Sequence, residues 1–561
     1  TGKAMALRAG LNLTAGLAAG LAAGLAARVK AAMDGWDARR STERLWAKDA
    51  TLWTNSGEGA WLGWLDVAAL DRQALAALAK RVETATRAEC RDVLLIGMGG
   101  SSLAPEVIAG TLPPGHTGTA KRSLRVLDST HPVAVLDAFA SIDWTRTMIV
   151  VASKSGSTLE PDILLSAALE RARAKLGADA PKHVIAITDP GSKLAAQAAE
   201  LGFAGVFLGD PAIGGRFSAL SPFGFVHLAQ RGIALDDFLA SARDMARLCT
   251  EPAHENPGVQ LGAFLAIAAR AGRDKCTLVL PPSFAAIGAW IEQLVAESTG
   301  KNGNAILPID GEPLGEPDVY GADRAFVHVR DLSAPDGDAS GRTVVTRLDA
   351  LAAAGHPVFT IDVPSPAALA GEFFRWEFAT AVAGALLGVN PFDQPDVEAS
   401  KIATRSLTDA RERGEAPVAV APDEGTLRDL LASIRDGDYF ALLAFLPMFD
   451  DVKTALQRTR QRVRDAKRVA TSLGFGPRFL HSTGQAFKGG PNTGVFVQLT
   501  WDGGTDLDVP GRRLTFGAVV AAQAAGDLAV LRSRGRRVVH VHLHGDLGAA
   551  LAEFDAAVTR Y

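Results

Sequence analysis

The stretch MIVVASKSGSTLEP, residues 148–161, passes from a short apolar run into a cluster of hydroxyl side chains. A short apolar run that ends at Ser or Gly is typical of a buried strand, and the pattern over 158–175 predicts a helix after it. The same alternation surrounds this stretch: it predicts strands at 93–97, 124–128, 148–153, 184–188 and 205–209, with a further helix at 191–201. Buried strands that alternate with helices indicate a parallel sheet covered on both faces.

Two further regions repeat this alternation. The first predicts helices at 258–272, 285–297 and 366–387, and strands at 276–282, 325–329 and 356–363. The second predicts strands at 439–446, 495–501 and 538–544, a basic helix at 450–470 and a helix at 516–532. The charged stretch 398–426, with Pro417 and Pro422, is interpreted as a linker between them. Before all of these lies a Trp-rich stretch that predicts a packed N-terminal collar, with Trp46, Trp53, Trp61 and Trp64.

The predicted fold class is therefore α/β, with three regions of parallel sheet covered by helices. Its expected parts are an N-terminal helical collar (1–88), a first α/β domain (89–250), a second (251–401) and a C-terminal α/β domain (402–561).

Composition excludes several classes of protein. The chain has 561 residues, 48% hydrophobic and 21% charged, which is typical of a globular protein with large cores. The net charge of -4 gives no basic excess to attract nucleic acid or an acidic membrane. Cys90, Cys249 and Cys276 lie far apart and form no CxxC pair, so we expect buried thiols in a reducing, cytoplasmic compartment, with no disulfide framework.

The uncharged segment 9–27 has the length of a signal peptide or membrane helix. It consists mostly of Ala and Gly, and Leu recurs every four residues, so a surface helix that packs a Leu stripe is the better interpretation. The chain begins at Thr1 rather than Met, which is compatible with a fragment or one half of a longer polypeptide.

Two turns after strands have the composition of anion sites. Ligands of open parallel sheets bind beyond the carboxyl ends of the strands. The turn GMGGSS contains Gly99, Gly100 and Ser101, and the turn SKSGST combines several hydroxyls with a helix N-terminus. That combination suits a phosphate bound without metal, the alternative being an ordinary Ser/Thr helix cap. A nucleotide is less favoured, because there is no GxxxxGK[ST] spacing and Asp128 lies too far from the first turn for a Rossmann fingerprint.

Four stretches could carry acid–base chemistry: IGGRFSALSPFG (213–224), VAESTGKNG (295–303), GVNPFDQPDVEASK (388–401) and RFLHSTGQAFKGGPN (478–492). Glu297 ends an apolar helix next to a glycine turn. A carboxylate in such a partly desolvated place can have its pKa raised toward the working pH, as a general base requires. The alternative is a solvated carboxylate.

The motifs MGGSS, SKSGST, GGRFS, ESTGK and FDQPDVEASK stand in the order found in phosphoglucose isomerases. The chain resembles the isomerase half of bifunctional transaldolase–phosphoglucose isomerases, particularly in LWAKDATLW and HSTGQAFKGGPNTGVFVQL. The resemblance extends from Lys48 to Leu543. It implies two sugar-isomerase domains, matching the first two α/β regions, and interconversion of glucose 6-phosphate and fructose 6-phosphate without metal or organic cofactor.

The resemblance also implies roles for individual residues. Glu297 would shuttle a proton between C1 and C2 through a cis-enediolate, and Arg216 would stabilise the charge that develops. Lys401 and Gln394 would lie near the ring oxygen and the phosphate end. The substrate-binding residues would be Gly99, Gly100 and Ser101 at the sugar, and Ser153, Lys154, Ser155, Ser157 and Thr158 at the phosphate.

One feature departs from the family pattern. The His segment between the ESxGK and FDQ motifs is absent, and His328 lies in a predicted buried strand, where a His is usually structural. HSTGQ follows the FDQ motif instead, so ring opening is assigned to His481, with Lys488 as a possible neighbour. In the family this His comes from a neighbouring subunit, which implies a homodimer with shared sites. The resemblance further implies a transaldolase domain fused before residue 1.

Two alternative functions remain. The chain could be a non-catalytic sugar-phosphate sensor, although a sensor has no need of Glu297, Arg216 and Lys401, or an isomerase of a related phosphosugar such as mannose 6-phosphate. His540, His542 and His544 alternate along a predicted strand and would share one face, as zinc ligands do. No fourth ligand is placed by the sequence, so no metal is predicted. The basic helix 450–470 is interpreted as a solvated face rather than a nucleic-acid site.

Overall fold

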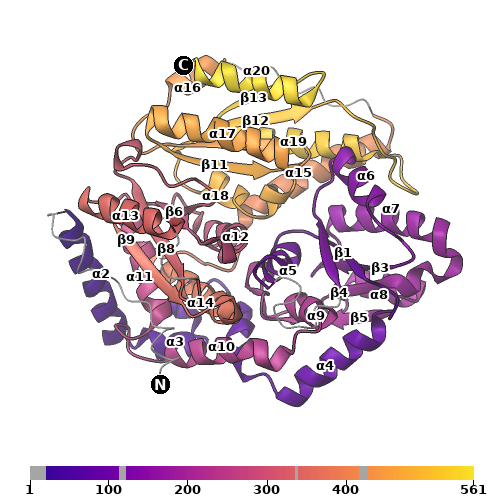
Figure 1. Ribbon diagram of the computed structural model, residues 1–561, viewed down its shortest axis with the longest axis horizontal. Coiled ribbons are helices and arrows are strands. Elements are labelled where there is room, and N and C mark those ends of the chain that lie inside the picture. Colours follow the sequence, from indigo (N-terminus) through magenta and orange to yellow (C-terminus); the bar gives the residue numbers. More distant parts are fainter. Residues whose placement is uncertain (1–20, 113–121, 335–338, 416–425, 561) are drawn as a thin grey trace.

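The computed structural model describes residues 21–112, 122–334, 339–415 and 426–560 (Figure 1). These residues form three parallel sheets, each covered by helices, which confirms the predicted α/β class. The three sheets lie within residues 92–208, 275–363 and 439–543. The domain limits proposed from the sequence remain predictions.

The first sheet has the strand order β2-β1-β3-β4-β5. Its strands are β1 (Asp92–Gly97), β2 (Ser123–Leu127), β3 (Thr147–Ala152), β4 (Val184–Thr188) and β5 (Gly205–Leu208). Their side chains alternate between two cores: one packs on α6 (Pro132–Ala140), α7 (Leu159–Leu176) and α8 (Lys193–Leu201), the other on α4 (Arg72–Ala85) and α9 (Pro222–Gln230). Because the chain leaves β1 for β2 and returns to β3 on its other side, the strand order reverses between β1 and β3. Ligands of open α/β sheets bind in the crevice at such a reversal.

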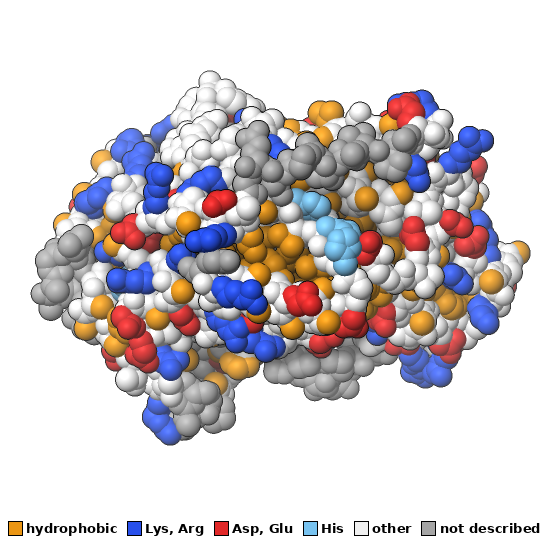
Figure 2. Space-filling model, turned by 90° about the horizontal axis from the view of Figure 1, so that it is seen from above, with side chains coloured by type: hydrophobic (Ala, Val, Ile, Leu, Met, Phe, Trp, Pro, Cys, Tyr) orange, Lys and Arg blue, Asp and Glu red, His pale blue; other side chains and the backbone are white. Residues whose placement is uncertain are grey.

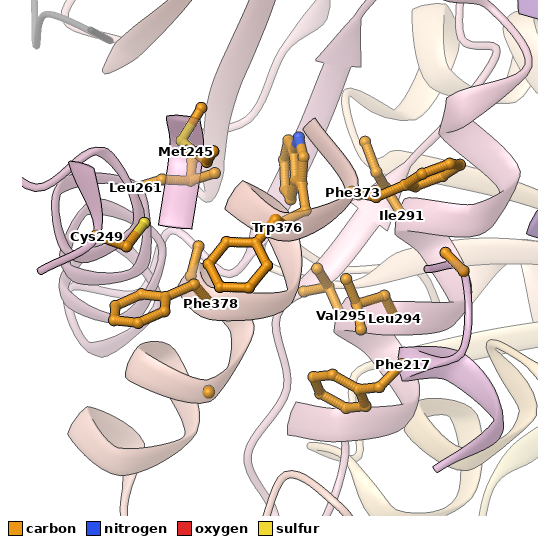
Figure 3. Packing of buried hydrophobic residues seen from close by; sticks show 14 of the residues in the cluster. Phe217, Met245, Cys249, Leu261, Ile291, Leu294, Val295, Phe373, Trp376 and Phe378 are labelled. Atoms are coloured by element: carbon orange, nitrogen blue, oxygen red, sulfur yellow. The ribbon is translucent and has the colours of Figure 1, made fainter. Parts of the chain in front are cut away.

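The second sheet has the order β7-β6-β8-β9, with β6 (Lys275–Val279), β7 (Leu307–Ile309), β8 (Arg324–Asp331) and β9 (Val358–Val363). The helices of this region are α10 (Leu235–Leu248), α11 (Pro257–Arg270), α12 (Ile287–Thr299), α13 (Ala339–Ala353) and α14 (Leu369–Leu387). Figure 3 shows Phe373, Trp376 and Phe378 of α14 projecting into the core beside Ile291 and Leu294 of α12. Full burial of one such aromatic side chain contributes about 1.5–3 kcal/mol to stability. This core fixes α12, which carries Glu297 at its end.

The third sheet has the order β11-β10-β12-β13 and lies uppermost in Figure 1. Its strands are β10 (Tyr439–Phe445), β11 (Ala470–Phe475), β12 (Gly494–Trp501) and β13 (Arg537–Leu543), and its helices include α16 (Leu427–Ala432), α17 (Asp450–Lys467), α18 (Gly484–Gly489), α19 (Phe516–Ser533) and α20 (Leu547–Thr559). One core joins Tyr439 and Phe487 to Ala296 of α12. Another joins Phe516 to the helices of the first sheet. The third sheet therefore packs on both of the others.

The N-terminal helices α2 (Leu21–Ala38) and α3 (Ser41–Trp46) precede the Trp-rich stretch. Trp46 stacks on Phe374, and Trp64 packs on Phe217 with ring centroids 5.5 Å apart. Trp53 packs too, but Trp61 is 38% exposed, so the expected collar includes three of its four tryptophans. Most of the predicted Leu-stripe segment 9–27 lies outside the described residues. Among the helices that the structure does describe, none has the length and apolar character that spanning a membrane requires.

The expected linker 398–426 is wrong over its first half, because α15 runs from Pro395 to Glu412. Val397, Ser400, Thr404 and Thr408 recur at helical spacing and are buried. Three of the four are small and polar, so the stripe was not recognisable as an apolar one. α15 packs against α19.

The basic helix 450–470 corresponds to α17, but its interpretation as a solvated face fails at two arginines. Arg460 donates to Asp310 O and to Thr471, and Arg464 donates to Pro313 O. Both guanidiniums are buried against the loop that follows β7 of the second sheet. Carbonyl oxygens of this loop accept their hydrogen bonds in place of water. Several elements were not foreseen, among them β7, with three residues, β11, whose sequence ATSLGF mixes polar residues with Gly, and the helices α10, α13 and α20.

Candidate functional site

The turns after β1 and β3 lie side by side at the reversal of strand order. Gly97 pairs with Ala152 at the ends of the two strands, and α5 (Gly100–Thr111) and α7 begin just beyond. α5 starts at Gly100, within the turn GMGGSS itself. The two turns predicted to bind the sugar and the phosphate are therefore neighbours.

The hydroxyl-rich turn opens on a cavity of about 660 Å³. Ser157 Oγ lies 3.1 Å from Ser155 Oγ, and Ser153 Oγ lies 3.4 Å from Thr158 Oγ1. None of these side chains caps α7, whose N-cap residue Thr158 makes no capping hydrogen bond. The hydroxyls and the first N–H groups of α7 thus stay available to an anion. The cavity lining includes Ser155, Ser157, Thr158, Glu160, Lys401 and His481.

Lys154 is turned away from this cradle. Its ammonium lies 2.8 Å from Asp189 Oδ1 and donates to Asp210 O at 3.0 Å. Lys154 does not line the cavity. In this arrangement it fixes the loop after β3 to the loops after β4 and β5.

Glu297 and Arg216 form a buried ion pair, and neither of them lines the cavity. Arg216 Nη1 lies 3.4 Å from Glu297 Oε1, and both side chains are less than 10% exposed. Arg216 also donates to Ser298 Oγ at 2.7 Å and to Gln394 Oε1 at 2.9 Å. Burial lowers the pKa of Arg216, against the opposing effects of Glu297 and Asp393. One guanidinium thus joins three of the sequence motifs.

The glycine turn after β1 is pressed against the same helix. A Cβ on Gly99, which has φ +56°, would lie 2.7 Å from Gln293 Nε2, and one on Gly100 would collide with Gly215 O. Ser101, the third residue predicted at the sugar, is buried beside them. The glycines thus let the backbone approach Gln293 closely.

Gln293 connects the base candidate to the histidine segment. Its amide donates to Glu297 Oε2 at 3.2 Å and to His481 O at 2.8 Å. Gln293 lies one turn before Glu297 on α12, so both point the same way.

His481 reaches the cavity from the third sheet's side. Its Nε2 lies 3.1 Å from Glu160 Oε1, and Gln523 donates to the same oxygen at 2.8 Å. Burial acts to raise the pKa of Glu160, but the charge and hydrogen bond of His481 outweigh it, so the pKa is lowered overall. Glu160 is held ionised beside the imidazole.

The segment that carries His481 is anchored at both ends. Arg478 makes ion pairs with Glu106 of α5 and with Asp128 beyond β2. Gln485 accepts from the backbone N–H groups of Asp396 and Val397 and donates to Gly300 O at 2.9 Å. This segment therefore belongs to the site of its own chain.

Lys401 and Gln394 complete the set of predicted site residues, and Lys301 of the ESTGK motif was not among them. Lys301 donates to Asn390 O at 2.7 Å and to Asp393 Oδ1 at 2.6 Å, and burial lowers its pKa to about 8. Lys401 is 39% exposed at the cavity, where its nearest carboxylate is Glu398 at 3.6 Å. Gln394 is bound to Arg216 and does not line the cavity. Lys488, expected near His481, forms a buried pair with Asp527 at 2.6 Å.

Sequence reasoning missed Glu160, Gln293 and Gln485. Glu160 stands two residues after Thr158 in the first turn of α7, and Gln293 one helical turn before Glu297, so both were reachable by helical spacing. The contacts of Gln485 join residues nearly 90 positions apart. No local pattern signals such contacts.

The arrangement combines an anion cradle at the cavity, a buried carboxylate–guanidinium pair joined through Gln293 to the His481 backbone, and a carboxylate–imidazole pair at the same cavity. The first can hold a phosphate, the second can move a proton and stabilise an oxyanion, and the third can transfer a proton to an oxygen.

Comparison with known proteins agrees with this chemistry. Residues 72–306 match the family model of phosphoglucose isomerase. The chain is 31% identical over 381 residues to the glucose-6-phosphate isomerase of Thermosynechococcus vestitus, a match that covers 60% of this chain and 70% of that protein. It is also 31% identical over 400 residues to the glucose-6-phosphate isomerase of Symbiobacterium thermophilum, covering 62% of this chain and 87% of that protein.

Solved structures share the fold. A hypothetical protein from Thermus thermophilus superposes with a TM-score of 0.58 at 26% identity, over 71% of this chain and 99% of that one. A glucose-6-phosphate isomerase from Chlamydia trachomatis superposes with a TM-score of 0.52 at 21% identity, over 62% of this chain and 74% of that one. With the motifs, the sequence matches and the clustered acid–base groups in agreement, the chain belongs to the phosphoglucose isomerase family of enzymes.

Proposed function

We propose that this enzyme interconverts glucose 6-phosphate and fructose 6-phosphate through a cis-enediolate, with Glu297 as the base. The observation that carries the proposal is the position of Glu297: it is buried against Arg216 and joined through Gln293 to the backbone of His481, which lines the hydroxyl-rich cavity.

The phosphate binds at the turn after β3, where Ser155, Ser157 and Thr158 line the cavity. Ser153 supports this turn from the buried side. Hydroxyls and a helix N-terminus compensate the charge without a metal. Gly99, Gly100 and Ser101 border the sugar, and Lys401 lies across the cavity from the cradle.

His481 opens the ring. It accepts the proton of the C1 hydroxyl as the C1–O5 bond breaks, and the imidazolium then donates that proton to O5. Glu160 supports the imidazolium that forms during this step, because a carboxylate at 3.1 Å favours the charged ring. The proposed ring-opening group thus lies in the same chain as the base.

Glu297 then removes the C2 proton of the open aldose and returns it to C1. Arg216 stabilises the enediolate oxygen, since a fixed cation needs no reorganisation as charge develops. A proton transfer between O1 and O2 completes the ketose.

The first test is turnover of fructose 6-phosphate by the purified chain in EDTA, measured as NADPH from coupled glucose-6-phosphate dehydrogenase. We expect steady, metal-independent turnover. A folded chain that binds the sugar phosphate without turning it over would refute the enzyme proposal in favour of a sensor.

The proton transfer is tested by Glu297→Gln. The variant should lose about 10²–10⁴-fold in kcat, the usual contribution of a general base, and should still bind a phosphosugar inhibitor. The matched control is Glu398→Gln, an exposed carboxylate at the rim of the same cavity, which should stay near wild-type turnover. Full activity of Glu297→Gln would rule out the assigned base.

Three wider expectations belong to this proposal: a cytoplasmic location, a role in glycolysis and the pentose phosphate pathway, and a transaldolase domain fused before residue 1. Intact mass of the natural polypeptide, with a transaldolase assay on it, tests the fusion. A homodimer is also expected from the resemblance.

A further inference from the structure

A cluster of two histidines and an aspartate lies at the carboxyl edge of the third sheet. β12 and β13 are paired to their ends, Trp501 opposite Leu543, and Asp502 and His544 follow immediately. His542 stands one residue before the end of β13. Figure 2 shows histidine side chains exposed on this face, next to an acidic side chain and an apolar hollow. The cluster consists of Asp502, His542 and His544.

The two distances from Asp502 to the histidine nitrogens are closer to those of a metal site than to those of a set of hydrogen bonds. Asp502 Oδ2 lies 3.3 Å from His542 Nε2 and 3.6 Å from His544 Nδ1, and all three atoms lie within 4.8 Å of one another. An N–H···O bond is usually about 2.7–3.2 Å long. Two ligand atoms on a tetrahedral zinc ion, with bonds of about 2.0–2.1 Å, are roughly 3.3–3.4 Å apart.

A surface pair elsewhere in the chain shows the contrast. His254 Nε2 lies 2.7 Å from Asp34 Oδ1, with both side chains exposed, as in an ordinary hydrogen bond. Asp502, in contrast, has two imidazole nitrogens facing one carboxylate oxygen, both beyond that distance.

Thr500 orients the cluster from inside the sheet. Its Oγ1 lies 2.8 Å from His542 Nδ1 and 2.7 Å from His540 Nε2. A hydroxyl has one proton, so it donates to one ring and accepts from the other. When it accepts from His542 Nδ1, the lone pair of His542 Nε2 points toward Asp502. Histidine ligands of metals are usually held in this way through their second nitrogen.

We propose that Asp502, His542 and His544 bind a divalent transition-metal ion of the zinc class, with a coordination position left for water. Two imidazoles and one carboxylate favour zinc and its neighbours over magnesium or calcium, which prefer oxygen ligands. His540 is a positioning residue that acts through Thr500. None of the four residues belongs to the isomerase site. The ion would therefore be bound at this edge of the third sheet and would take no part in the sugar chemistry.

The test is zinc binding by the EDTA-treated, dialysed full chain, measured by equilibrium dialysis with metal analysis. We expect about one equivalent at roughly micromolar zinc, since a three-ligand site retains substantial affinity. Asp502→Asn and His542→Ala should each weaken this binding more than about tenfold, and His540→Ala by about tenfold through loss of orientation. His254→Ala, which removes the ordinary surface pair, should leave the affinity unchanged.

Isomerase turnover in EDTA provides the folding control, because all four variants should retain the activity of the unaltered chain. No binding at about 100 µM zinc, a concentration at which such ligand sets are normally filled, would overturn the proposal. So would an affinity that Asp502→Asn and His542→Ala leave unchanged in active, folded variants. Failure of the isomerase assay alone would concern the proposed function and not this site.

Discussion

His481 is the residue on which the proposed mechanism departs furthest from its relatives. Its imidazole is paired with Glu160 rather than solvated, so its role in ring opening depends on both groups. We expect His481→Ala to lower kcat on cyclic glucose 6-phosphate by about 10²–10⁴-fold, as removal of a general acid–base group does, and to affect an open-chain substrate analogue much less.

Glu160→Gln should follow the same pattern with a smaller loss, because the amide keeps the contact but not the charge. The ratio of the two substrates, measured by the same coupled assay, separates a ring-opening role from a folding defect. Equal losses on cyclic and open-chain substrates would contradict the assignment of His481.

Glu377 is buried in α14 and, among the described residues, its carboxylate oxygens have no hydrogen-bond partner. Burial raises its pKa well above the ordinary value. The folded state therefore keeps this proton to a higher pH than the unfolded state does. The stability linked to it is fully present below the ordinary carboxyl pKa and is lost as pH rises toward the raised one.

Glu377→Met should remove this pH-dependent loss of stability and the cost of burying a carboxyl group without a hydrogen-bond partner. The free energy of unfolding should rise by about 1–3 kcal/mol, and this gain should grow as pH rises. Thermal unfolding of both chains, measured at a series of pH values upward from the ordinary carboxyl pKa, checks this gain. Exposed Glu200→Met is the control. A lower Tm with an unchanged pH slope would contradict the prediction.

Single residues were predictable where a local pattern carried the signal. The hydroxyls at 153–158 and the glycines at 99–100 follow strands, and the structure places both turns at one reversal of strand order. Asp502 and Gln485 could not be predicted, because their partners lie about 40 and 90 residues away. Lys154 stands in the hydroxyl-rich turn and was predicted to bind the phosphate. Its ammonium pairs instead with Asp189, which lies in the loop after the next strand.

At the scale of elements, α18 and the short turn before it are held on α15 by one side chain. Gln485 is fully buried and makes four hydrogen bonds, all to Gly300, Asp396 and Val397. Gln485→Ala should cost about 1–3 kcal/mol, since two backbone N–H groups and a carboxylate lose a buried partner. Denaturant unfolding measures this loss.

Activity of Gln485→Ala should fall as well, because the same segment carries His481. The exposed Gln73→Ala in α4 is the control and should change neither property. A variant that is destabilised but fully active would show that the segment reaches the cavity without this contact.

Strands with a continuous apolar pattern were predicted well, whereas several helices were missed, α10 and α20 among them. The strands of the first sheet agree with prediction within one or two residues, because fully buried strands are continuous apolar runs. α15 was missed because small polar side chains pack its buried face, and Arg460 and Arg464 were placed in solvent because their acceptors are loop carbonyls of another sheet. Tertiary contacts of this kind leave no local periodicity.

At the scale of the whole molecule, the site forms where the three sheets meet. The first sheet supplies the hydroxyl cradle and Glu160, the second supplies Glu297 on α12, and the third region supplies His481 (Figure 1). The resemblance implied that the histidine would come from a neighbouring subunit. The contacts of His481 with Glu160 and Gln293 are made within one chain, so we expect each chain to complete its own site even if a homodimer forms.

This difference is measurable by mixing two inactive chains. If sites were shared, co-assembly of Glu297→Gln with His481→Ala would rebuild one intact site in each mixed dimer. Random pairing makes about half of the dimers mixed, and one of the two sites in each is intact, so turnover would be about a quarter of the wild-type value. If each chain completes its own site, every site in every dimer lacks one group. We therefore expect turnover no higher than the sum of the two variants assayed separately. Turnover near the shared-site value, with dimers verified by differently tagged subunits, would place His481 in the partner's site and overturn the single-chain arrangement.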